Sequence, residues 1–254
     1  MNGAAETCDA LLGGRVMLWQ PARGYRAATD PVLLAAAVPA RAGQRVLDLG
    51  CGAGAAALCL AARVAGLELH GLELQDRYAD LAERNAAANG VDLRVHRGDA
   101  AAMPPALRRI DFDHVMTNPP YFPADRALAA RDPGRDAALR EGGLDLAGWI
   151  GAALRRLRPG GWLTLVHRAE RLPAILAALE GRAGAVTVLP LAPRQGRPAG
   201  RIILRARKGA RAPFRLLAPL VLHAGPVHLR DGDDFTPRAR AVLREGAGLV
   251  EFDS

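Results

Sequence analysis

The stretch Asp48-Leu49-Gly50-Cys51-Gly52-Ala53-Gly54 decides the fold. It follows the apolar run Val46–Leu49 and precedes a helical pattern over Ala55–Val64. Glycines at this place let the backbone turn sharply and approach a ligand without an intervening Cβ. The N-terminus of the helix that follows offers free N–H groups to an anionic or carboxylate-bearing ligand. A strand, a glycine loop and a helix in this order predict the ligand-binding edge of a doubly wound sheet.

Strand and helix patterns alternate on both sides of this loop. Short apolar or alternating runs predict strands at 46–49, 67–74, 91–95, 110–116 and 162–167, and helical patterns lie at 55–64, 76–89 and 144–157. The last helix is closed by Arg158-Pro159-Gly160-Gly161. After a helix at 171–181, runs at 185–189 and 201–205 predict a hairpin. The expected fold class is α/β, a doubly wound, mostly parallel, Rossmann-like sheet of about seven strands with a C-terminal antiparallel hairpin.

Length and composition favour one main domain. The chain has 254 residues, 26.8 kDa and 50% hydrophobic residues, so we expect a domain over 41–254 preceded by an extension or lid over 1–40. No apolar run approaches the length of a membrane span, and the first residues lack the order of a signal peptide, so a cytoplasmic location is expected. Cys8, Cys51 and Cys59 form no C-x-x-C pair and predict neither a disulfide framework nor a metal site.

The basic charge makes a polyanion a plausible partner. The formal charge is +8 and the pI about 10.5, although a solvated basic surface explains these values equally well. The stretch Pro190–Gly200 is basic and rich in turn-forming residues. On charge and loop position, Arg194, Arg197 and Arg201 are candidates for RNA phosphate contacts, and an ordinary surface loop is the alternative.

The glycine loop alone fits two cofactors. Gly50, Gly52 and Ala55 satisfy the dinucleotide pattern G-x-G-x-x-A, and Glu73 lies about 20 residues further on, where an acid binds ribose. However, Asp48 at the strand end and Gly54 as a third glycine resemble the D-x-G-x-G-x-G signature of class I S-adenosylmethionine-dependent methyltransferases.

This resemblance implies roles for several residues. The backbone from Gly50 through Gly52 to Gly54, with Asp48, would face the methionine end of S-adenosylmethionine, and Glu73 would take the ribose hydroxyls. Gly98-Asp99-Ala100, just past the third strand, resembles the position at which these enzymes meet adenine, so Asp99 and Ala100 would hold that base. Glu73 and Asp99 could alternatively be exposed carboxylates at strand ends.

A second motif, Asn118-Pro119-Pro120-Tyr121, follows the strand predicted at 110–116. The two prolines fix φ and remove two N–H donors, so the tetrapeptide forms a stiff bracket. The Asn118 side-chain oxygen and the Pro119 carbonyl could accept the two hydrogens of a planar amino group and prepare its nitrogen for methylation. Tyr121 offers a face on which a planar substrate could stack. The motif serves adenine N6, guanine N2 and glutamine amide nitrogen alike, and a plain Pro-Pro turn that caps a strand is the structural alternative.

The stretch 24–34 resembles the corresponding segment of the bacterial tRNA(Val) adenine-N6 methyltransferase family. The likeness continues through both motifs, Arg158-Pro159-Gly160-Gly161 and Arg201–Leu204, and covers about residues 15–250. It implies an S-adenosylmethionine-dependent enzyme that methylates adenine N6 in tRNA. It also places Thr29 and Asp30 near the cofactor, although a helix N-cap pair is an equal interpretation.

The resemblance is incomplete, and other functions stay open. Ala27-Ala28 replaces the aromatic and small residues common before Thr-Asp in relatives. The alternatives are glutamine-N5 methylation of release factors, whose enzymes carry a larger N-terminal helical domain, adenine-N6 methylation of DNA, guanine-N2 methylation of rRNA, and a non-catalytic RNA-binding protein.

Overall fold

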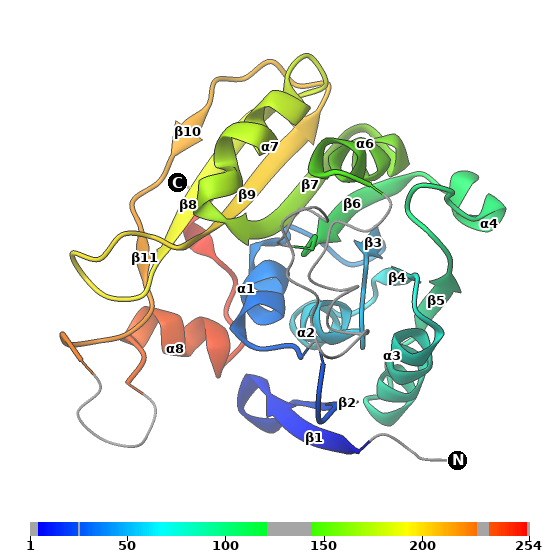
Figure 1. Ribbon diagram of the computed structural model, residues 1–254, viewed down its shortest axis with the longest axis horizontal. Coiled ribbons are helices and arrows are strands. Elements are labelled where there is room, and N and C mark those ends of the chain that lie inside the picture. Colours follow the sequence, from blue (N-terminus) through cyan, green and yellow to red (C-terminus); the bar gives the residue numbers. More distant parts are fainter. Residues whose placement is uncertain (1–4, 25, 121–143, 228–233, 253–254) are drawn as a thin grey trace.

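The computed structural model describes residues 5–24, 26–120, 144–227 and 234–252. In these residues a nine-stranded sheet runs in the order β5-β4-β3-β6-β7-β9-β8-β10, and β11 also pairs with β8 (Figure 1). The strands are β3 (Arg45–Leu49), β4 (Glu68–Glu73), β5 (Leu93–Arg97), β6 (Phe112–Thr117), β7 (Leu157–Arg168), β8 (Ala183–Ala192), β9 (Arg201–Lys208), β10 (Arg215–Leu216) and β11 (Leu220–Val221).

Helices cover both faces of this sheet. One hydrophobic cluster joins the sheet to α1 (Thr29–Ala37), α2 (Ala55–Arg63), α3 (Asp76–Ala88) and α8 (Pro237–Leu243). The other joins it to α4 (Pro105–Arg108), α6 (Leu146–Arg156) and α7 (Leu172–Leu179). Short 3-10 helices lie at η1 (Leu12–Gly14), η2 (Ala169–Arg171) and η3 (Val250–Phe252). No helix in the described ranges is long and apolar enough to cross a membrane.

The strand order creates one switch point. β3 pairs in parallel with β4 on one side and with β6 on the other, while β9 pairs antiparallel with both β7 and β8. Ligands bind outside the carboxyl ends of the strands where the order reverses, which here means the ends of β3 and β6. The predicted doubly wound, mostly parallel sheet with an antiparallel hairpin, β8–β9, is confirmed, and the two-residue strands β10 and β11 bring the predicted number of about seven strands to nine. The hairpin is not terminal, because the chain continues through β10, β11 and α8.

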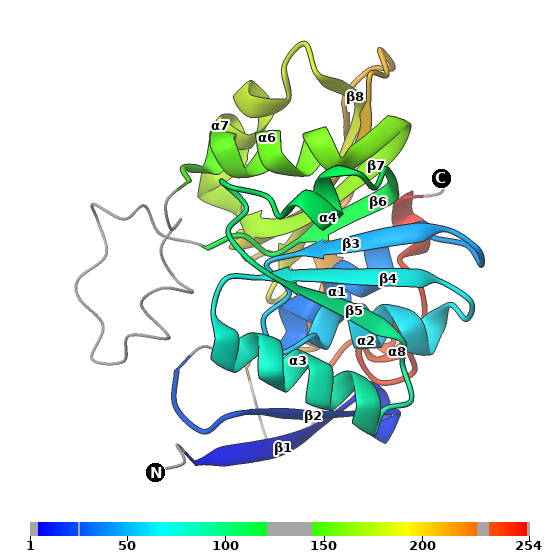
Figure 2. The ribbon, with the colours of Figure 1, turned by 90° about the vertical axis from the view of Figure 1, so that its right-hand side faces the viewer.

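A second, two-stranded sheet precedes the main one. β1 (Glu6–Leu11) pairs antiparallel with β2 (Val16–Pro21), and the hairpin lies beneath α3 in Figure 2. Asn85 of α3 is fully buried; its side chain accepts a hydrogen bond from Trp19 N at 2.8 Å and donates to Trp19 O at 2.8 Å and Ala53 O at 2.9 Å. One amide therefore joins the hairpin to the glycine loop, because Ala53 lies inside that loop.

Replacing Asn85 by alanine is expected to lower the free energy of unfolding by about 3 kcal/mol, because three backbone groups lose a buried partner. Asn89, one helical turn later, is the matched control, since it makes the same paired contact with Met17 N and Met17 O at the exposed end of the hairpin. Asn89→Ala should cost about 1 kcal/mol, because water can replace the lost amide. Urea unfolding of both variants measures the difference, and equal losses would contradict the role of Asn85.

Candidate active site

The glycine loop adopts a backbone that favours glycine. Gly50, Gly52 and Gly54 have φ values of +76°, +54° and +87°, all in the left-handed region. A Cβ on Gly50 would also lie 3.0 Å from the ring of Trp149. The turn is fixed to the next strand because Gly50 N and Cys51 N both donate to Leu72 O, at 2.9 and 3.0 Å.

A pocket opens above this loop, with about 410 Å³ of non-atom space that includes part of the solvent opening. It brings together residues from the ends of β3 and β6, the start of α2, α3 and the N-terminal region. Its lining consists of Gln20, Ala27, Pro31, Leu34, Asp48, Gly50, Cys51, Ala53, Ala55, Ala56, Tyr78 and Asn118. Residues of the two motifs thus line one pocket.

Asp48 is the buried charge of this pocket. Its side chain is on β3, the residue is only 3% exposed, and no hydrogen-bond partner within the described residues reaches its Oδ2. Burial raises the pKa of the Asp48 carboxyl to about 7. A backbone hydrogen bond from Ala57 lowers this pKa, and the negative charge of Glu73 raises it. A buried carboxylate with an unused acceptor is suited to a cationic group, because such a partner would offset the cost of its burial.

Glu73 is the last residue of β4, and its carboxylate binds the backbone of the glycine loop. Its Oε2 accepts from Gly52 N and its Oε1 from Gln75 N, both at 2.9 Å. Burial raises the pKa of Glu73, while these N–H donors lower it. Each oxygen keeps a lone pair that a ligand hydroxyl could use, although Glu73 is not part of the pocket lining.

Asp99, Ala100, Thr29 and Asp30, the other proposed cofactor residues, are not part of the pocket lining. Asp99 follows β5 at the same edge of the sheet and accepts from Ala101 N at 2.8 Å, and Ala100 is buried. Thr29 and Asp30 begin α1, but the N-cap position is Ala28, which makes no side-chain cap. Asp30 instead forms an ion pair with Arg201.

Thr117, the residue directly before Asn118, connects the second motif to the rest of the site. Thr117 Oγ1 donates to Leu49 O at 2.7 Å and accepts from Trp149 Nε1 at 2.9 Å. The sequence pattern indicates a core role for Trp149, yet its indole bonds the residue before Asn118, and its ring contacts the Gly50 position. An apolar helix face gives no signal for such a contact. Tyr121 lies outside the described residues.

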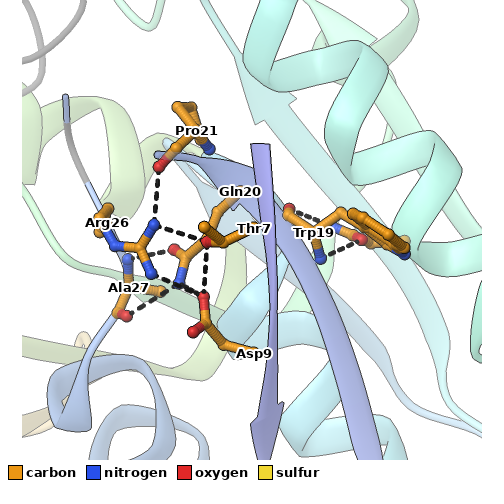
Figure 3. A network of polar contacts seen from close by, with 8 residues as sticks. Thr7, Asp9, Trp19, Gln20, Pro21, Arg26 and Ala27 are labelled. Atoms are coloured by element: carbon orange, nitrogen blue, oxygen red, sulfur yellow. Dashed lines mark hydrogen bonds and ion pairs between the residues drawn. The ribbon is translucent and has the colours of Figure 1, made fainter. Parts of the chain in front are cut away.

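The N-terminal hairpin contributes Gln20 to the pocket lining, and Figure 3 shows the polar network around this side chain. Gln20 Oε1 accepts from Ala27 N at 2.8 Å, and Gln20 Nε2 donates to Asp9 Oδ2 at 2.7 Å. The Arg26 guanidinium donates to the same carboxylate at 2.7 Å and to Pro21 O at 2.9 Å. This network holds the Gln20 and Ala27 side chains at the pocket, which explains how residues before the main sheet contribute to it.

The loop after β8 carries Arg194 and Arg197, two of the predicted phosphate contacts, and their contacts differ. Arg194 forms an ion pair with Asp234 at 2.7 Å and donates to Ala224 O and Gly225 O, so its guanidinium ties the loop to the segment before α8. Arg197 is exposed, and no ion pair to it is found in the described parts of the chain.

Burial lowers the pKa of His114 and of His167 to about 4, so both are neutral at pH 7. No group of three or more metal-ligating side chains occurs among the described residues.

The comparisons define the class of protein first. Residues 28–131 match the family model described as "Methyltransferase small domain". A crystal structure of a predicted O-methyltransferase from Agrobacterium tumefaciens superposes with a TM-score of 0.70 at 30% identity, over 87% of this chain and 98% of that one. A T. thermophilus 16S rRNA N2 methyltransferase, solved with AdoMet and guanosine, shares the fold at a TM-score of 0.56 and 22% identity, over 80% of this chain and 50% of that one. The fold is that of a class I methyltransferase.

Curated relatives narrow the class. The protein named tRNA1(Val) (adenine(37)-N6)-methyltransferase of Aeromonas hydrophila subsp. hydrophila is 35% identical over 183 residues, 71% of this chain and 76% of its own length. The protein of that name from Dickeya chrysanthemi is 32% identical over 213 residues, 81% of this chain and 80% of its own. The chain belongs to the family of these tRNA1(Val) (adenine(37)-N6)-methyltransferases.

Proposed function

We propose that this chain transfers the methyl group of S-adenosylmethionine to the exocyclic N6 of adenine 37 in a tRNA. The observation that carries the proposal is that Asn118 of the second motif lines the same pocket as Asp48 and Gly50 of the first. A group that binds an amino nitrogen and a loop that binds a cofactor are therefore adjacent. The names of the relatives supply the substrate class.

The residues present fit the cofactor. S-adenosylmethionine, when bound, supplies a methyl group on a sulfonium centre together with an ammonium, a carboxylate, a ribose and an adenine. The Asp48 carboxylate would accept from the ammonium, and the N–H groups at the start of α2 suit the carboxylate. Glu73 has acceptor capacity left for the ribose hydroxyls, and Asp99 and Ala100 follow the next strand for the adenine.

The bracket would act on the substrate nitrogen. Asn118 Oδ1 and the Pro119 carbonyl accept the two amino hydrogens, which favours a pyramidal nitrogen whose lone pair points away from the ring. With the cofactor bound, this nitrogen would take the methyl group as the carbon–sulfur bond breaks, and its excess proton would leave to solvent. Positioning and hydrogen bonding supply the rate enhancement, so no side chain has to act as a base.

The test uses labelled S-adenosylmethionine and bulk tRNA that lacks the modification. After incubation, the RNA is digested and the labelled nucleosides are identified by mass spectrometry. We expect the label in N6-methyladenosine, at position 37 when fragments are mapped. Label in another nucleoside, or only in a release-factor glutamine offered in a parallel reaction, would overturn the substrate assignment while leaving methyl transfer intact.

Arg194, Arg197 and Arg201 remain proposed phosphate contacts. Arg197 is the most accessible of the three, because Arg194 and Arg201 each hold a carboxylate of their own chain. The loop that carries them lies between the end of β8 and the start of β9, at the same edge of the sheet as the pocket.

A further inference from the structure

Six basic side chains gather at the edge of the sheet opposite the pocket. We call them the basic rim: Arg108, Arg155, Arg156, Arg182, Arg207 and Lys208. They come from the ends of α4 and α6, the residue before β8 and the end of β9. β8 starts and the antiparallel β9 ends at this edge, whereas the pocket lies where β3 and β6 end.

Contacts between these elements make the rim continuous. Arg156 donates to Leu107 O of α4 at 2.9 Å, and Lys208 Nζ donates to Leu157 O at 2.5 Å. Gly209 N donates to Arg182 O at 3.0 Å, and Figure 1 shows the turn after α7 beside the end of β9. Elements far apart in sequence thus present their basic side chains on one connected surface.

Two of these guanidinium groups are close neighbours. Arg182 Nη2 and Arg155 Nη1 lie 3.1 and 3.4 Å from the point that a Cβ on Gly151 would occupy, so they are at most 6.5 Å apart (3.1 plus 3.4). Burial lowers the pKa of Arg156, the charge of Asp111 raises it, and the charges of Arg155 and Arg108 lower it. The folded chain therefore tolerates repulsion between like charges at this edge.

The side chains of the rim bond backbone groups rather than carboxylates. Their hydrogen bonds go to backbone carbonyls, and within the described residues none of the six forms an ion pair, although the charge of Asp111 acts on Arg156. Several arginines elsewhere do pair with a carboxylate: Arg26–Asp9, Arg84–Glu6, Arg97–Glu83, Arg194–Asp234, Arg201–Asp30 and Arg238–Glu251. Four of the six, Arg108, Arg155, Arg182 and Arg207, are exposed. The charge here is available to an external anion.

We propose that the basic rim binds the phosphate backbone of the RNA substrate at a place remote from the target nucleotide. This proposal rests on the proposed function for the identity of the polyanion. The two edges are separated by the length of β6, which has six residues, or about 20 Å at 3.3 Å each. The phosphates at the rim therefore belong to a different part of the RNA from the base in the pocket, and the rim adds affinity without taking part in the reaction.

The test measures binding of unmodified tRNA, without cofactor, to wild type and to an Arg155→Gln/Arg182→Gln variant over a range of salt concentrations. Loss of two phosphate contacts should raise the tRNA Kd about tenfold and reduce the slope of log K against log salt by about 2. The kcat at saturating tRNA should stay unchanged, because neither residue lines the pocket. The matched control, Arg155→Lys/Arg182→Lys, retains the charges and should bind tRNA within about twofold of wild type.

The outcomes separate the rim from the proposed function. If wild type binds tRNA and the variant shows the expected loss, the rim is supported even when no adenine is methylated, and that second result would count against the proposed function alone. The proposal that the rim binds RNA would be overturned by an unchanged Kd and salt slope in the Gln variant, or by the absence of tRNA binding in wild type. A Gln variant that loses kcat but not affinity would also overturn it. Thermal unfolding of both variants checks that the fold is retained.

Discussion

An Asn118→Ala variant should lose methyl transfer by about a thousandfold in kcat while binding S-adenosylmethionine within a few-fold of wild type. The side chain lies at the end of β6 and contributes one of the two acceptors that would hold the amino group. Its removal leaves the glycine loop untouched, because Leu72 O and Glu73 hold that loop. Single-turnover labelling gives the rate, and calorimetric titration gives the cofactor affinity.

An Asn118→Asp variant is the matched control, since it keeps an oxygen at the same position and should retain more activity than alanine. A Thr117→Val variant tests the support of the bracket, because it removes the hydroxyl that joins Leu49 O to Trp149 Nε1. It should lower kcat less than Asn118→Ala does. Loss of cofactor affinity in Asn118→Ala, with kcat preserved at saturation, would give Asn118 a cofactor role and contradict its assignment.

The central strands and helices were predictable because each one buries a periodic apolar pattern. β3, for example, buries Val46, Leu47 and Leu49, and α2 follows the glycine loop directly. The carboxyl-edge position of both motifs follows from the parallel topology alone. For this reason, reading the sequence was enough to place Asp48, Gly50 and Asn118 together.

The N-terminal hairpin was missed because its strands carry no clear signal of their own. β1 reads Glu-Thr-Cys-Asp-Ala-Leu, and β2 is held by Asn85, 66 residues from Trp19 in the chain. The ion pair between Asp30 and Arg201 joins residues 171 positions apart. Contacts of this range depend on the assembled fold, so local patterns predict neither the pairing of Asp30 nor the support that Glu73 gives to the loop.

The buried carboxyl of Asp48 lowers the free energy of unfolding of the cofactor-free protein. Its carboxyl has a folded pKa of about 7 because burial disfavours the charged form, whereas an unfolded Asp has a pKa of about 3.9. Between these two pH values the folded state binds the extra proton, so stability falls as pH rises from about 4 to 7. Above about pH 7 the whole penalty is present, about 4 kcal/mol, because a change of 1 in pKa corresponds to about 1.4 kcal/mol.

Asp48→Asn should therefore have opposite effects on stability and on binding. The neutral amide avoids the cost of burying a charge, so the free energy of unfolding of the cofactor-free protein at pH 9 should rise by about 4 kcal/mol, with little change near pH 4. The affinity for S-adenosylmethionine at pH 8 should fall about a hundredfold, because the ammonium of the cofactor loses a buried carboxylate partner. Urea unfolding at the two pH values and calorimetric titration at pH 8 measure both effects. If the variant is less stable at pH 9 and binds the cofactor normally, Asp48 supports the loop rather than the ligand. A gain in stability together with a loss of binding indicates that the Asp48 carboxylate destabilises the cofactor-free protein and binds the ammonium of the cofactor.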